Sequence, residues 1–219
     1  GSPNSYSWEV RTSGAVGSGP AGLASSGTLT AGAITVPVNN LTAGASHTFY
    51  IRSNCGLQTS DWVASTFTAA CNAISVPYFE NFDGVTPGTY PPCTRMEDLY
   101  DYTTWYTTPC IPKSNPHSLI RESSATYYTD EWFFTAPLQL IPGRTYRLSL
   151  YYRQYGSGYT DGFEIRIGKY AQGNEMSATP VYTNINVNST LYQQGTAEFT
   201  VPDTGVYYLG LRYIPLSYT

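Results

Sequence analysis

The feature that most constrains this chain is a two-residue alternation of apolar and polar side chains that recurs along it. Between residues 144 and 153 one side carries Tyr146, Leu148, Leu150 and Tyr152, and the other carries Arg147, Ser149, Tyr151 and Arg153. Similar stripes occupy residues 6–10, 163–167, 197–201 and 207–213. Strands with this pattern have one solvent-exposed face and one buried face. The pattern therefore favours an antiparallel sandwich over a parallel sheet.

The composition supports the same fold class. The 219 residues include 21 Tyr, 20 Gly and 15 Pro, whereas only 12% of residues are charged. This balance is typical of half-exposed strands that are joined by Gly/Pro turns. We find no helical periodicity long enough to predict a helix. We therefore expect an all-β protein.

Charge and hydropathy exclude two classes of partner. The formal net charge is −4, and the sequence has no basic run, so we expect no nucleic-acid partner. No apolar run approaches the length of a membrane span, so we expect no membrane insertion.

The four cysteines, Cys55, Cys71, Cys93 and Cys110, form no CxxC pair and lie far from both histidines in sequence. This spacing argues against a zinc site and indicates disulfides formed in an oxidising compartment. Four cysteines allow three pairings. Short loops favour Cys55–Cys71 with Cys93–Cys110, one bridge in each half of the chain, and four buried thiols are the alternative.

The composition changes near Cys71. Up to that residue the charged side chains are Glu9, Arg11, Arg52 and Asp61, which cancel, and the rest of the chain has 13 acidic and 9 basic residues. We therefore predict two domains, residues 1–71 and 72–219.

The first domain resembles the middle and end of fibronectin type III-like domains of large secreted bacterial surface proteins. The matching stretches are residues 6–14 (YSWEVRTSG), 41–44 (LTAG), 50–56 (YIRSNCG), 60–62 (SDW) and 67–71. The resemblance starts at the third strand of that fold and implies a partial sandwich. The tyrosine that the family places six residues after its corner leucine is here His47, for which we predict a backbone hydrogen bond.

The second domain resembles jelly-roll domains known as cleaved-adhesin, MAM-like or choice-of-anchor domains. The matches are residues 79–83 (FENFD), 91–92 (PP), 130–133 (DEWF), 136–140 (APLQL), 143–146 (GRTY) and 205–210 (GVYYLG). The family's acidic loop is represented by Glu97, Asp98, Asp101 and Trp105 without its glycines. The family's last strand is expected beyond Thr219.

Together the two resemblances imply a secreted or outer cell-surface bacterial protein, exported by type IX secretion, with other domains in a longer polypeptide. They imply an accessory module for adhesion or for binding carbohydrate or protein. The alternative is a purely structural spacer of a larger secreted protease or glycanase.

No arrangement of side chains predicts an enzyme. The two histidines, His47 and His117, lack the context of a catalytic triad, and no GxSxG, HExxH or phosphate-binding glycine loop occurs. Asp161 and Glu164 point to opposite faces if they share a strand, so they cannot flank one glycosidic bond.

Binding residues are suggested by aromatic side chains near predicted strand ends. The candidates are Tyr127, Tyr128, Trp132, Tyr151, Tyr155 and Tyr159, with Arg153 and Gln154 as polar partners. Aromatic faces suit the C–H surfaces of sugars. The alternative is that these side chains fill or cover the sandwich. We therefore predict a polysaccharide or a surface protein as the partner.

The jelly-roll resemblance also implies a structural calcium ion at the first strand. Glu80 and Asp83 occupy that position, and both can reach one ion only if the strand ends near Phe82. The alternative is that Glu80 pairs with an arginine such as Arg212, while Asp83 bonds to its own turn.

Overall fold

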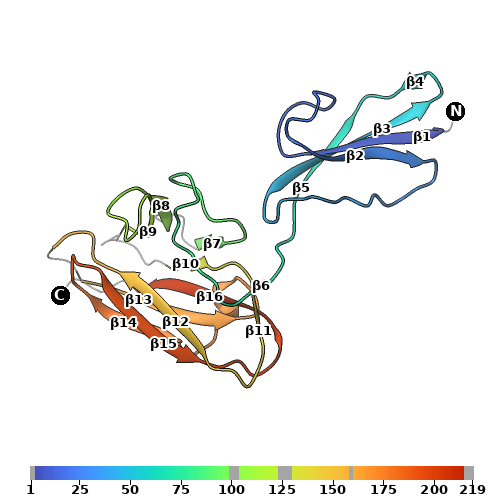
Figure 1. Ribbon diagram of the computed structural model, residues 1–219. Helices are drawn as coiled ribbons and strands as arrows, with labels where there is room; N and C mark the ends of the chain where they lie inside the picture. Colours follow the sequence, from blue (N-terminus) through green and yellow to red (C-terminus); the bar gives the residue numbers. More distant parts are fainter. Residues whose placement is uncertain (1–2, 99–103, 123–129, 158–159, 215–219) are drawn as a thin grey trace. The chain divides into compact units, whose positions relative to one another are not determined.

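The computed structural model describes residues 3–98, 104–122, 130–157 and 160–214, which form strands β1 to β16 and one short 3₁₀ turn (Figure 1). The prediction of an antiparallel all-β fold is confirmed. The chain divides into two compact units, Gly1–Cys71 and Asn72–Thr219. None of the helical segments in the described residues is long and apolar enough to cross a membrane.

The strands of the first unit form one antiparallel sheet. They are β1 (Ser5–Arg11), β2 (Leu23–Thr30), β3 (Ser46–Cys55), β4 (Gln58–Thr59) and β5 (Val63–Thr68). β1 lies between β2 and β3, and β4 and β5 both pair with β3. Trp8 is opposite Gly27 on one side and Ile51 on the other. A Cβ on Gly27 would lie 2.9 Å from the Trp8 ring, so this close packing requires glycine.

Two polar side chains are buried in this sheet. Arg11 is only 2% exposed; its Nε bonds to Glu9 Oε2 (2.6 Å), and its Nη2 donates to the carbonyl of Gly19 (2.8 Å). His47 donates from Nδ1 to the carbonyl of Ala45 (2.9 Å) and stacks on Phe67. The predicted backbone hydrogen bond of His47 is therefore present.

The second unit is built on a larger sheet with the order β14-β13-β16-β10-β7. These strands are β14 (Tyr182–Val187), β13 (Asp161–Gly168), β16 (Gly205–Ile214), β10 (Glu131–Phe134) and β7 (Arg95–Asp98). β11 (Leu138–Leu140) also pairs with β16, and β6 (Ile74–Ser75) runs parallel to β11. Two smaller antiparallel pairs complete the unit, β12 (Tyr146–Tyr152) with β15 (Gln193–Phe199) and β8 (Tyr106–Thr108) with β9 (Ser118–Ile120).

The β12–β15 pair packs on the inner face of the larger sheet. The apolar stripe of β12 contacts a buried cluster formed by Phe163, Ile165 and Val187. A second cluster centres on Leu138, Leu140, Val201 and Tyr207, and a third on Trp105, Phe133 and Tyr213. The alternation in the sequence thus correctly predicts which side chains of β12, β13 and β16 face the core.

The opposite face of the larger sheet is covered by the segment after β13, which contains the 3₁₀ turn Gly173–Glu175. Trp132 and Phe134 stack there with ring centroids 5.7 Å apart, and Trp132 is 3% exposed. A Cβ on Gly173 would lie 2.5 Å from the Trp132 ring nitrogen. The prediction that Trp132 belongs to an exposed platform is therefore wrong, because this segment closes over it.

The predicted disulfides are also wrong. Cys71 and Cys93 are disulfide-bonded, whereas Cys55 and Cys110 are exposed free thiols. Because the chain has four cysteines, the one disulfide joins Cys71 to Cys93.

The length of β3 explains the error. Cys55 ends β3, whereas the amide of Ala69, two residues before Cys71, donates to Ala45 beside the opposite end of that strand. A ten-residue strand spans roughly 30 Å. A disulfide requires Cα atoms within about 7 Å of each other.

Candidate functional site

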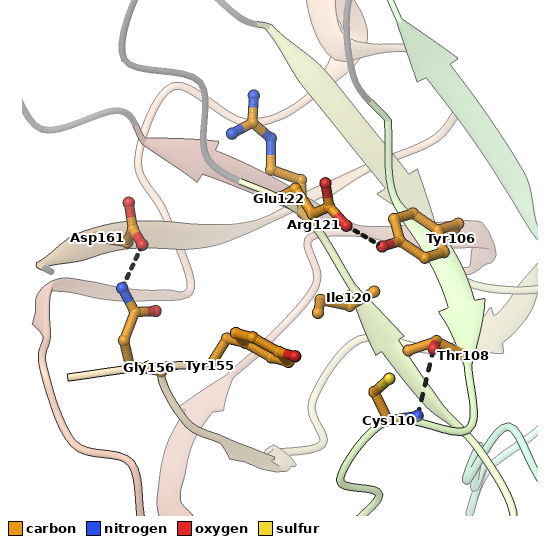
Figure 2. A pocket seen from close by; sticks show the side chains of 10 residues that line it. Tyr106, Thr108, Cys110, Ile120, Arg121, Glu122, Tyr155, Gly156 and Asp161 are labelled. Carbon is orange, nitrogen blue, oxygen red and sulfur yellow. Dashed lines mark hydrogen bonds between the residues drawn. The ribbon is translucent and has the colours of Figure 1, made fainter.

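A cavity of about 300 Å³ opens in the second unit between the β8–β9 hairpin and the segment that joins β12 to β13 (Figure 2). It is lined by Tyr106, Thr108, Cys110, Ile120, Arg121, Glu122, Gln154, Tyr155, Gly156 and Asp161. The first six come from the hairpin and the residues next to it, and the last four come from the end of β12 to the first residue of β13. Segments that are about 30 residues apart in sequence therefore form one site.

The hairpin wall carries a tyrosine bound to a carboxylate. Tyr106 donates its hydroxyl hydrogen to Glu122 across the start of the hairpin. This hydrogen bond, together with burial, raises the pKa of Tyr106 to about 12. Tyr106 therefore keeps its proton at neutral pH, and the remaining lone pairs of Glu122 can accept hydrogen bonds at the cavity mouth.

The facing wall carries a second carboxylate, Asp161. Its Oδ2 accepts from Gln154 Nε2 and its Oδ1 accepts from the Tyr213 hydroxyl, both at 2.6 Å. The register of β13 against β14 shifts between Asp161 and Phe163, which marks a bulge or irregularity at the start of β13. Asp161 faces the cavity, whereas Glu164, which is 4% exposed, bonds to Arg166 and Arg212 in the covered outer layer. The predicted divergence of these two carboxylates is confirmed.

The basic side chain of the cavity lining is already paired. Arg121 Nε donates to Glu131 Oε2 (2.8 Å) and Arg121 Nη2 donates to Glu131 Oε1 (3.1 Å). The Arg121 guanidinium also lies 3.8 Å from the centre of the Tyr213 ring. The side chains of this ion pair are 1% and 0% exposed. Arg121 thus neutralises Glu131 rather than the two cavity carboxylates.

One exposed aromatic ring, that of Tyr155, lines the cavity, and Tyr151 and the half-buried Tyr192 contact residues of the hairpin loop. Tyr155 is 65% exposed and lines the cavity itself, and Tyr151, 52% exposed, lies outside it on the outward face of β12. Lys113 Nζ is 4.7 Å from the centre of the Tyr151 ring. The Cζ atom of Arg153 lies 5.7 Å from the centre of the Tyr192 ring. The hydroxyl of Tyr192 donates to the carbonyl of Ile111 (2.7 Å), which ties the loop of the hairpin to the start of β15.

The predicted binding residues thus lie in different parts of the structure. Tyr155 and Gln154 line the cavity, Tyr151 and Arg153 lie beside it, and Trp132 is buried in another layer. Tyr127, Tyr128 and Tyr159 lie outside the described residues. Tyr106, Ile120 and Glu122 were not predicted from the sequence, because the two short strands of their hairpin show too little alternation to mark them.

Glu80 and Asp83, the predicted calcium ligands, lie in one turn. Glu80 Oε1 accepts from the amide of Phe82 (2.7 Å), a residue with φ of 62°, and the amide of Asp83 donates to Asn81 Oδ1 (3.2 Å). Burial and then the charge of Asp83 raise the pKa of Glu80. Arg212, the example given of an arginine that could pair with Glu80, instead forms ion pairs with Asp130 and Glu164.

In the described part of the chain, no group of three or more His, Cys, Asp or Glu side chains could hold a metal ion. Two carboxylates provide fewer than the six to eight oxygens that calcium prefers. The calcium ion therefore stays a prediction that rests on Glu80 and Asp83.

Comparison with known proteins gives only remote similarity. No family model matches the sequence, and no curated protein matches it. A cleaved adhesin domain of Lys-gingipain from Porphyromonas gingivalis matches 62% of this chain and 86% of its own length, with 13% identity and a TM-score of 0.45. The N-terminal tandem of two family 22 carbohydrate-binding modules from Paenibacillus barcinonensis matches 100% of this chain and 67% of its own, with 14% identity and a TM-score of 0.43.

These values are too low to assign a family or a ligand to this chain. The resemblance of the first unit to fibronectin type III-like domains stays a prediction.

Proposed function

We propose that Asn72–Thr219 is a non-catalytic binding module and that its ligand is a carbohydrate, with one sugar residue held in the cavity. The observation that carries this proposal is the exposed ring of Tyr155 beside the oxygen atoms of Asp161 and Glu122 in a hollow of about 300 Å³. That volume is at the lower end of the range of about 300–1,000 Å³ for small-molecule sites.

The chemistry of the walls suits a pyranose ring. A sugar has an apolar C–H face, which packs on an aromatic ring, and a rim of hydroxyl groups, which require hydrogen-bond partners. Tyr155 and Ile120 supply apolar surface, and Glu122, Asp161 and Thr108 supply oxygen atoms. The described lining contains no histidine that could activate the Cys110 thiol as a nucleophile, which favours binding over catalysis.

A polymer could extend beyond the cavity across the neighbouring rings. Tyr151 and Tyr192 lie on the same side of the unit as the hairpin loop, because Lys113 and Ile111 of that loop contact them. Further sugar residues of a polysaccharide or of a surface glycoprotein would contact the exposed part of the Tyr151 ring and the cationic groups of Lys113 and Arg153 that lie over the two tyrosines. The disulfide supports a location outside the cytoplasm, secreted or on the outer cell surface.

Replacement of Tyr155 by alanine tests the proposal. The full chain is screened for retardation in gels that contain polysaccharides of different backbones, and the dissociation constant is then measured for the strongest binder. Loss of the ring should weaken binding by about tenfold or more, since central aromatic side chains often contribute over about 1.4 kcal/mol. Stability should change by less than about 0.5 kcal/mol because Tyr155 is largely exposed.

Tyr170→Ala is the matched control. Tyr170 is 63% exposed but follows the opposite end of β13 from Asp161, so its loss should leave binding unchanged. The proposal fails if no polysaccharide retards the chain, which would favour the structural spacer, or if both variants bind as the unaltered chain does.

A further inference from the structure

The hydrogen bonds of the cavity walls run from the protein's own donors to its own carboxylates. Tyr106 donates to Glu122, Gln154 donates to Asp161, and Arg121 donates to Glu131. Tyr213 adds a second hydrogen bond to Asp161. These bonds leave acceptor positions open on Glu122 and Asp161, since a carboxylate has about four lone-pair sites, and the hydroxyl groups of Tyr155 and Thr108 add neutral groups that can both donate and accept.

The described charges at the site leave a net negative charge once the pairing of Arg121 with Glu131 is included. Glu122 and Asp161 line the cavity, and the basic residue of the described lining, Arg121, is paired with buried Glu131. Lys113 and Arg153 lie outside the lining, each over the ring of a tyrosine. A negatively charged group inside the cavity would meet two carboxylates, and the one cation among the described lining residues, Arg121, is already balanced by Glu131, so like-charge contacts would oppose its binding.

We infer that the cavity selects a sugar residue that brings hydrogen-bond donors and carries no negative charge, and that it rejects uronic acids and other anionic sugars. This inference rests on the proposed function. Hydroxyl groups and protonated amines both satisfy it, because each donates to Glu122 and Asp161. A carboxylate or sulfate donates nothing and repels both. The ligand class is therefore neutral or amino sugars.

A matched series of monosaccharides tests the inference on the full chain. Glucosamine and glucuronic acid each differ from glucose in one substituent. Galactose, galactosamine and galacturonic acid form the same series with the other C4 configuration. Dissociation constants are measured by NMR titration at neutral pH and low salt. Glucuronic or galacturonic acid should bind at least about tenfold more weakly than the neutral and amino sugars of its series, because loss of one charge-assisted hydrogen bond costs about that factor.

The variant Glu122→Gln tests whether Glu122 is the residue that discriminates against uronic acids. The amide oxygen can still accept from Tyr106, so the wall keeps its shape while one charge is removed. The preference over the uronic acid should then fall to about threefold or less, whereas Glu175→Gln, which removes the same charge from an exposed position in the 3₁₀ turn, should leave it unchanged. Higher salt should also reduce the preference in the unaltered chain.

The outcomes separate the two proposals. Equal or tighter binding of the uronic acids, or an unchanged preference in Glu122→Gln, overturns the inference and leaves carbohydrate binding intact. Absence of binding by all six sugars, together with no polysaccharide binding, contradicts the proposed function and removes the inference with it.

Discussion

The strands of both units alternate apolar and polar side chains, but the two units bury their apolar side chains in different ways. In Gly1–Cys71 the strands form one sheet, and the buried side chains among the unit's described residues are the apolar Trp8, Val10 and Ala69 together with the polar Arg11 and His47. In Asn72–Thr219 two sheets face each other, and three apolar clusters fill the space between the layers and beneath the hairpin. Alternation therefore determines that a segment forms a strand with two distinct faces. A second layer determines whether one of those faces becomes an apolar core.

The largest expected effect comes from comparing Phe134, which the segment after β13 covers on the outer face of the larger sheet, with Phe67 of the first unit. Phe134 is fully buried against Trp132, so Phe134→Ala should lower the free energy of unfolding of the second unit by about 3–5 kcal/mol. Phe67 stacks on His47 but is only half-buried, so Phe67→Ala should cost about 1–2 kcal/mol in the first unit. Amide hydrogen exchange with peptide resolution measures each unit separately. Equal losses in the two units would contradict the comparison.

A smaller effect is expected from the disulfide. It closes a loop over residues 72–92, and removal of such a cross-link by Cys71→Ser in the oxidised protein should lower the free energy of unfolding by about 3 kcal/mol. Cys55→Ser removes an exposed free thiol and should change stability by less than about 0.5 kcal/mol. Peptide mapping under non-reducing conditions checks the pairing, and a Cys55–Cys71 peptide would show that the bond is misassigned.

The smallest effect concerns Glu80, where burial and Asp83 raise the pKa in the folded state. A carboxyl group with a raised pKa opposes folding when it is ionised, and this penalty disappears as the pH falls through the raised pKa to the ordinary value of 4.5. Glu80→Gln should therefore stabilise the second unit at pH 7 by less than about 1 kcal/mol and should have no effect near pH 4.

Calcium should act at the same turn if the predicted ion binds there. Melting curves of the full chain with calcium and with a chelator should differ by a few degrees, and Glu80→Gln should abolish the difference. Glu175→Gln is again the matched control. Identical melting curves with calcium and with chelator would remove the calcium site, and a calcium response that Glu80→Gln leaves intact would move it elsewhere.

The sequence by itself determined the local features of this protein. Period-two alternation predicted the strands and their inward residues, as in Tyr146–Tyr152, because successive side chains of a strand point to opposite faces. The spacing of Asp161 and Glu164 likewise predicted that their carboxylates diverge. These features depend on neighbours within one strand, so the sequence contains the information needed to infer them.

Only the tertiary structure decided which distant segments meet. Ten residues of β3 separate Cys55 from the region of Cys71, the segment at Gly173 covers Trp132, and a short hairpin brings Tyr106 and Glu122 opposite Tyr155 and Asp161. Each of these contacts depends on how sheets and loops pack against one another. The alternation of side chains within one strand does not determine that packing. The cavity and the pairing of the cysteines therefore became visible only in the folded chain.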